Sequence, residues 1–200
     1  LDIEGAQEHR KLFEGLRVAE DAATMAWQGT RPVLFLTLKD WKGKSWEAML
    51  ENIRFLLGNL FSERDFLLKD DMKERDCRNF QAILDGTAGE PLLRDGLAFL
   101  LRLFSVHYGR KAVLLLDEYD APIQEAWANG FYNDAIDFFR TFFSRAIKTN
   151  ETLDFAVLTG VLRVSKESIF SGLNNLAISS VISGSYADAF GFTKQDVQKM

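Results

Sequence analysis

Residues 112–120 read AVLLLDEYD: five apolar residues run directly into a group of three carboxylates, Asp117, Glu118 and Asp120. A short, uninterrupted apolar run is typical of a strand that is buried on both faces of a parallel sheet. Such a strand presents its first polar residues at the carboxyl edge of the sheet, which is where ligands bind in open α/β folds. The sequence therefore predicts a buried β-strand that ends in an acidic turn.

The hydrophobic periodicity on either side of this strand alternates between strand-like and helix-like. Further strands are predicted at 33–38 and 155–158, with a weaker one at 177–182. Helices are predicted to start at a Ser45 cap, to run from Pro91 to Gly109, to start at Asn133 or Asp134, and to start at a Ser165 cap. This alternation implies right-handed crossovers and a mostly parallel sheet with helices on both faces. We therefore expect one three-layer α/β/α domain, with 63–84 as another helix or a surface insertion.

Composition excludes several classes of protein. The chain has 24 basic and 29 acidic residues, a net charge of −5 and 47% hydrophobic residues, which fits one globular domain. Because Cys77 is the single cysteine and His9 and His107 are the only histidines, a disulfide framework and a Cys/His zinc cluster are excluded, and the reducing cytoplasm is the expected compartment. No apolar run approaches the roughly 18 residues of a spanning helix. A pI near 5.2 argues against a broad nucleic-acid-binding face.

The apolar run followed by Asp-Glu is the Walker B pattern of nucleotide hydrolases. Asp117 would contact a magnesium ion through its water shell, and Glu118 would orient and polarise the water that attacks a γ-phosphate. Asp120 adds a third carboxylate, which we predict to contact the cofactor. The alternative is that acidic residues end this strand because the strand ends at solvent.

The next predicted strand is followed by two residues, Thr159 and Arg163, that point to the same chemistry. Thr159 would lie at the edge of an adjacent parallel strand, close to the two carboxylates, where its hydroxyl could sense a phosphate or hold the attacking water. Arg163 could bring a positive charge to the phosphate oxygens. The alternatives are a small polar turn at Thr159-Gly160 and a solvated surface arginine.

A phosphate-binding loop of the form G-x-x-x-x-G-K-[ST] is missing from the sequence. Gly43-Lys44-Ser45 resembles its last three residues, but Leu38 stands where the first glycine is needed to curl the backbone around an anion. We interpret Gly43 as a turn residue and Ser45 as a helix cap. This segment alone is therefore expected to bind nucleotide weakly or not at all.

Four longer segments resemble the AAA-ATPase-like family of bacterial, archaeal and protist proteins. They are LLLDEYDAPI (114–123), NGFYNDAIDFFR (129–140), LTGVLRVSKESIFSGLNN (158–175) and YADAFGFTKQDV (186–197). Members of this family look like P-loop ATPases of the additional-strand type, with ATP and Mg²⁺ as cofactors. Many carry a nuclease-like domain of the PD-(D/E)XK class further downstream.

The resemblance also implies an organisation for the chain. Residues 1–192 resemble the AAA-like ATPase core without its first strand and its phosphate (Walker A) loop, and 193–200 resemble the start of a lid or C-terminal region. Asp117 and Glu118 match the family's Walker B pair, Thr159 its sensor position and Arg163 a family arginine. The implied partners are ATP, a nuclease-like domain in the full-length protein, and further copies of the chain; no membrane is implied.

The leading hypothesis is Mg²⁺-dependent ATP binding and hydrolysis in the intact protein. One alternative is an interaction module without hydrolysis, which binds a partner through exposed Trp127, Phe131 and Tyr132. The other is a nuclease in which the carboxylates of 117, 118 and 120 bind two metal ions for phosphodiester cleavage.

Overall fold

A parallel β-sheet forms the centre of the molecule. The computed structural model describes residues 2–69, 72–148, 150–161, 177–180 and 194–199. Within these ranges, three strands pair in the order β1-β2-β3, namely β1 (Val33–Thr37), β2 (Ala112–Asp117) and β3 (Leu153–Leu158). Both pairings are parallel, and β2 is the central strand. The predicted α/β class with a parallel sheet is thus confirmed, and four of the six residues of β2 are buried, while Leu115 and Asp117 are partly buried.

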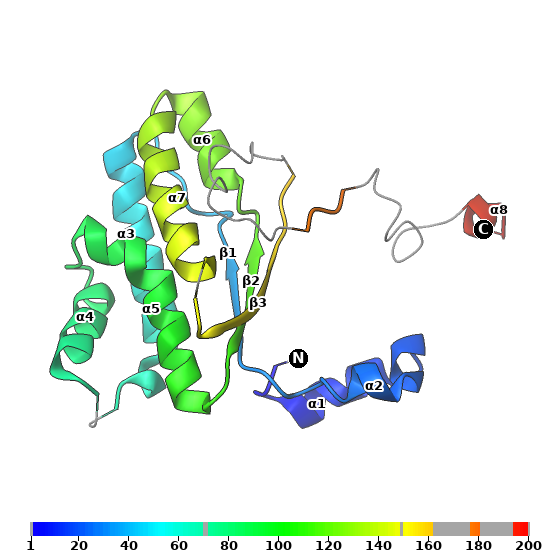
Figure 1. The fold of residues 1–200 in the computed structure, drawn as a ribbon. Helices are drawn as coiled ribbons and strands as arrows, with labels where there is room; N and C mark the ends of the chain where they lie inside the picture. The colour runs from blue at the N-terminus through cyan, green and yellow to red at the C-terminus, as the bar shows by residue number, and fades with distance from the viewer. Residues whose placement is uncertain (1, 70–71, 149, 162–176, 181–193, 200) are drawn as a thin grey trace.

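Helices connect and cover these strands (Figure 1). The longer ones are α3 (Trp46–Ser62), α4 (Glu74–Leu84), α5 (Glu90–Tyr108), α6 (Ala121–Asn129) and α7 (Tyr132–Ile147). Shorter ones are α1 (Ala6–Arg10), α2 (Ala22–Met25), α8 (Lys194–Lys199) and the 3₁₀ turns Lys11–Phe13, Arg17–Glu20 and Asp65–Leu67. None of the helices in the described ranges is long and apolar enough to cross a bilayer.

Most of the predicted helix ends are confirmed. The Ser45 hydroxyl accepts a hydrogen bond from the Ala48 N–H at 3.3 Å at the start of α3, and Gly109 ends α5 with a φ of 62°. The predicted cap of α7 at Asn133 or Asp134 is wrong, because α6, which was not predicted, ends at Gly130 with a φ of 83° and the chain re-enters a helix one residue later. Residues 177–180 are not in a strand, and 181–182 and Ser165 lie outside the described residues.

The core lies between one face of the sheet and the helices. On this inner face Leu34, Leu114 and Leu116 are almost completely buried. In Figure 1, α3, α5 and α7 lie on the same side of the sheet. Phenylalanines of α7 fill the space between them: Phe138, Phe139, Phe142 and Phe143 are fully buried. These rings are therefore core residues and are not available to stack on bases.

The opposite, outer face of the sheet is partly exposed in the part of the chain that the structure describes, although Val113 on β2 is buried. Phe35 on β1 is 55% exposed, and Phe155 and Val157 on β3 are 43% and 45% exposed. The register places Phe35 beside Leu115 and Leu115 beside Val157, so these apolar side chains share one face. Helices α3, α5 and α7 thus form one of the two helical layers that the sequence predicts.

Candidate functional site

The carboxyl ends of β2 and β3 meet at one edge of the sheet. The backbone pairing continues past β3, because the Thr159 N–H donates to the Leu116 carbonyl at 2.8 Å and the Tyr119 N–H donates to the Thr159 carbonyl at 3.1 Å. The Thr159 hydroxyl donates a hydrogen bond to Asp117 Oδ1 at 2.5 Å. The structure therefore places the Thr159 hydroxyl directly against the first carboxylate of the Walker B pattern.

A second threonine joins this edge from the other side. Thr37, the last residue of β1, is the register partner of Asp117, and the next residue, Leu38, donates its N–H to the Asp117 carbonyl at 2.9 Å. By strand alternation Thr37, Asp117 and Thr159 all belong to the outer face of the sheet. Thr37 was not predicted as a site residue, although a polar residue inside the apolar run 33–38 was a usable signal.

Glu118 has an unusual backbone conformation. Its φ of 51° is the single positive φ of a non-glycine residue in the described ranges. The left-handed region costs an L-residue roughly 1–2 kcal/mol, and such strained residues cluster at functional sites. The Ala121 N–H donates to the Glu118 carbonyl at 3.0 Å, so this conformation turns the chain from β2 into α6. The partly buried Glu118 side chain is thereby set at the same edge as Asp117.

Replacing Glu118 by glycine is expected to leave the free energy of unfolding unchanged or to raise it by up to ~1 kcal/mol. Glycine adopts a positive φ without steric cost, and its greater loss of chain entropy offsets part of that gain. Urea unfolding measures the effect. The matched control is Glu125→Gly inside α6, which should lose about 1 kcal/mol. An equal loss at the two positions would show that Glu118 is not strained.

Asp120 does not share the open edge with the other two acids. It is 1% exposed, its Oδ2 accepts a hydrogen bond from Gln124 Nε2 at 2.5 Å, and its Oδ1 accepts one from the Val161 N–H at 3.3 Å. Because both carboxylate oxygens already have partners inside the protein, the geometry favours a structural role over the predicted contact with a cofactor. It also weakens the nuclease alternative, which needs this carboxylate to bind a metal ion.

The residues that could approach a magnesium ion are few. Among the described residues, no group of three His, Cys, Asp or Glu side chains is arranged to hold a metal ion directly. Asp117 is partly buried and uses Oδ1 for Thr159, while Oδ2 makes no hydrogen bond to any described residue. This oxygen fits a hydrogen bond to a water of a Mg²⁺ hydration shell, which is the indirect contact predicted for Asp117.

The segment Gly43-Lys44-Ser45 has a local structural role. Ser45 caps α3, and a Cβ atom added to Gly43 would lie 2.3 Å from the backbone nitrogen of Met49. Gly43 therefore packs directly on the first turn of α3, where no side chain fits. The interpretation of Ser45 as a helix cap is confirmed, and Gly43 lies in the irregular segment just before it.

The surface predicted for the interaction module is only partly present. Trp127 is 72% exposed and its ring contacts Tyr132 edge to face, but Phe131 is 8% exposed. Phe131 packs in the core because the turn between α6 and α7 points its ring inward, so its predicted exposure is wrong. Arg163 lies outside the described residues.

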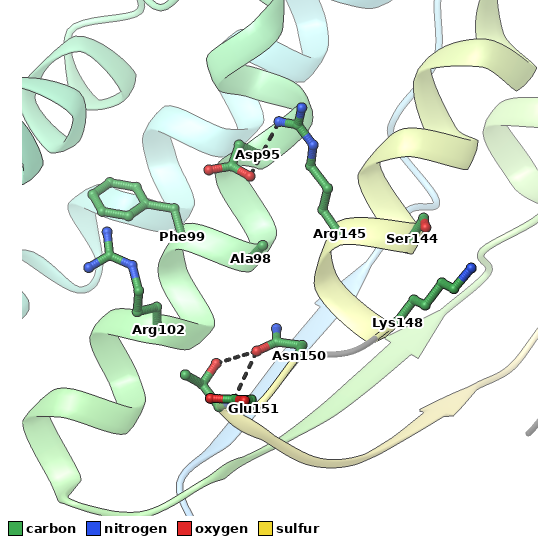
Figure 2. A pocket seen from close by; sticks show the side chains of 10 residues that line it. Asp95, Ala98, Phe99, Arg102, Ser144, Arg145, Lys148, Asn150 and Glu151 are labelled. Atoms are coloured by element: carbon green, nitrogen blue, oxygen red, sulfur yellow. Dashed lines mark hydrogen bonds and ion pairs between the residues drawn. The ribbon is translucent and has the colours of Figure 1, made fainter. Parts of the chain in front are cut away.

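A cleft of about 630 Å³ lies between α5 and α7, away from these carboxylates (Figure 2). Asn150 and Thr152 line it, which places it at the amino end of β3. Within it Arg145 contacts Asp95 at 3.3 Å. Arg102 donates to both oxygens of Asp76, and these hydrogen bonds lower the pKa of Asp76. The cleft therefore belongs to the helical layer and not to the edge with Asp117.

Comparison with known proteins gives two matches. A family model described as "Predicted AAA-ATPase" matches residues 2–170. A protein of Azotobacter chroococcum mcd 1, described as "Uncharacterized protein in vnfD 5'region", is 37% identical over 99 residues, which are 49% of this chain and 19% of that protein. The match thus spans about a fifth of the relative's length. No solved structure matches the chain.

Proposed function

Because the chain belongs to the family described as predicted AAA-ATPases, we propose that it forms the Walker B and sensor part of a domain that binds and hydrolyses ATP with Mg²⁺. One observation carries the proposal: the Thr159 hydroxyl donates to the Asp117 carboxylate at the carboxyl edge of two adjacent parallel strands. In open α/β folds this edge is where ligands bind.

The proposed roles follow from the position of each group. Asp117 would hold the metal ion through a water molecule at Oδ2, and Thr159 fixes the orientation of the carboxylate through Oδ1. The carboxylate of Glu118 orients the attacking water and accepts its proton. The Mg²⁺ ion, when bound, neutralises charge on the phosphate oxygens. Arg163 is proposed from the sequence to contact the same oxygens.

The phosphates of the nucleotide need a second binding element. The tight packing of Gly43 on α3 makes residues 43–45 unsuitable as a cradle of backbone N–H groups. We therefore propose that a phosphate loop elsewhere in the full-length protein supplies it, and that the chain in isolation binds ATP weakly. A cytoplasmic location, self-assembly and a downstream nuclease-like domain are further proposals that rest on the family resemblance.

The test is ATP hydrolysis by the full-length protein with and without Mg²⁺, comparing Thr159→Val with Thr159→Ser. Valine keeps the shape of threonine but removes the hydroxyl, and a hydrogen bond to a charged group contributes about 1.5 kcal/mol or more, so turnover should fall about tenfold. Serine retains the hydroxyl and should remain within about threefold of the unaltered protein. If the unaltered protein shows no Mg²⁺-dependent turnover, the proposed function is wrong. Equal turnover in all three proteins would exclude Thr159 from the reaction.

A further inference from the structure

We propose that Asp120 is a positioning residue, which holds the end of β3 so that the Thr159 hydroxyl meets the Asp117 carboxylate. The inference rests on the proposed function for its effect on turnover, but the contact itself can be tested without it. Asp120 would not touch nucleotide or metal. It would act through Thr159.

The contacts of Asp120 join two parts of the chain that are 41 positions apart. Its backbone carbonyl accepts the Ile123 and Gln124 N–H groups at 3.1 and 3.0 Å, which fixes the residue at the start of α6. Its carboxylate accepts the Val161 N–H at 3.3 Å, two residues after Thr159. The Gln124 side chain holds the other carboxylate oxygen at 2.5 Å. Asp120 thus ties the chain after β3 to the turn that carries Glu118.

Gly160 makes the approach of these two segments possible. A Cβ atom at residue 160 would lie 2.4 Å from Asp120 Oδ1 and 2.8 Å from Cε1 of Tyr119. Both distances are too short for any side chain, so the chain after β3 passes directly over the turn after β2. Thr159 is held from two sides. Its own carbonyl accepts the Tyr119 N–H, and two residues later the Val161 N–H donates to Asp120.

The buried Asp120 carboxylate restricts the movement of the segment that carries Thr159. Leaving a buried acceptor without its hydrogen bonds costs about 1–3 kcal/mol, so the Asp120 contacts restrict the segment strongly. A displacement of about 1 Å in a catalytic group can lower a rate about a hundredfold. Fixing Thr159 by contacts on both sides therefore keeps the Asp117 carboxylate in one orientation.

The test compares Asp120→Asn with Asp120→Ala in the full-length protein. Asparagine keeps Oδ1 for the Val161 N–H, and its amide can donate to Gln124 once the Gln124 amide is rotated, so kcat should stay within about threefold. Alanine removes the contacts to the Val161 N–H and to Gln124, and kcat should fall about tenfold or more with the KM for ATP within about threefold. If asparagine lowers kcat as much as alanine does, the carboxylate charge itself is needed and the proposal is wrong.

A double substitution separates positioning from a general loss of structure. If Asp120 acts through Thr159, Asp120→Ala should lower kcat less than about twofold in a Thr159→Val background. If the fold-reductions in kcat of the two single variants multiply in the double variant, the proposal is wrong. Should Asp120→Ala fail to fold, Gln124→Ala can replace it, because the Gln124 side chain is mostly exposed and its loss removes one of the Asp120 contacts. The double-mutant cycle of Gln124→Ala with Thr159→Val then tests the proposal.

Amide hydrogen exchange at Val161 gives a readout that does not need ATP turnover. Exchange should accelerate about fivefold or more in Asp120→Ala and stay near the unaltered rate in Asp120→Asn. Unchanged exchange in the alanine variant would refute the contact. A protein that shows the exchange effect but no Mg²⁺-dependent hydrolysis would instead leave the contact standing and refute the proposed function.

Discussion

Replacing Glu118 by glutamine in the full-length protein is expected to leave ATP bound and to lower its turnover about 10²–10³-fold. Glutamine keeps the size of the side chain and can still donate or accept a hydrogen bond, but it cannot take a proton from the attacking water. Binding should survive because the proposed metal contact belongs to Asp117 and not to Glu118. Single-turnover hydrolysis of ATP, together with the equilibrium dissociation constant of ATP, measures the two quantities separately.

The matched control for this substitution is an acid at the opposite end of the sheet. Glu151 is an exposed acid just before β3, at the opposite end of the strands, and Glu151→Gln should leave turnover within about twofold. Turnover in Glu118→Gln equal to that of this control would remove Glu118 from the reaction. A parallel loss of ATP binding in Glu118→Gln would assign the residue to binding and not to proton transfer.

The positions of the three strands along the sequence could be predicted because their signals are local. The run 112–116 is apolar at every position, which is typical of a buried strand in a parallel sheet, and the next run, at 155–158, ends at Thr159. Adjacent parallel strands bring their carboxyl ends to one edge, so the meeting of Asp117 with Thr159 followed from topology alone. The roles of these residues in hydrolysis stay predictions.

The position of Asp120 could not be predicted in the same way. In the sequence it is the third acid of DEYD and looks like its neighbours. What separates it from Asp117 is the left-handed backbone of Glu118, which turns the chain so that Asp120 points inward and meets Val161. The partner lies 41 residues away, and no periodicity or local motif encodes such a contact. Thr37 was missed for a related reason, since only the register of β1 against β2 places it beside Asp117.

The open outer face of the sheet bears on the same site. Phe35, Leu115 and Val157 lie in one row across the strands, and the row two residues further along consists of Thr37, Asp117 and Thr159. The polar edge is therefore the continuation of an apolar surface. The phosphate loop proposed for the full-length protein would have to reach this polar row to complete the nucleotide site.

Gly43→Ala is expected to lower the free energy of unfolding by about 3 kcal/mol, because the added methyl group would overlap the backbone of α3. The nearest atoms are the Met49 nitrogen at 2.3 Å, the Met49 Cα at 2.7 Å and the Ala48 carbonyl carbon at 2.8 Å. These atoms belong to a helix that is anchored in the core by Met49 and Ile53, both fully buried, so they cannot move aside as a flexible side chain would. Urea unfolding of the chain measures the loss.

Gly89→Ala is the matched control, because it also lies just before a helix but its added Cβ would meet only Pro91 Cδ at an ordinary 3.7 Å. Its loss should be at most about 1 kcal/mol, the usual cost of alanine at a helix cap. The ATP affinity of the full-length Gly43→Ala protein, measured where it remains folded, should be unchanged, since residues 43–45 pack against α3 and do not cradle phosphate. A stable Gly43→Ala protein with weakened ATP binding would reverse that interpretation and make Gly43-Lys44-Ser45 part of the nucleotide site.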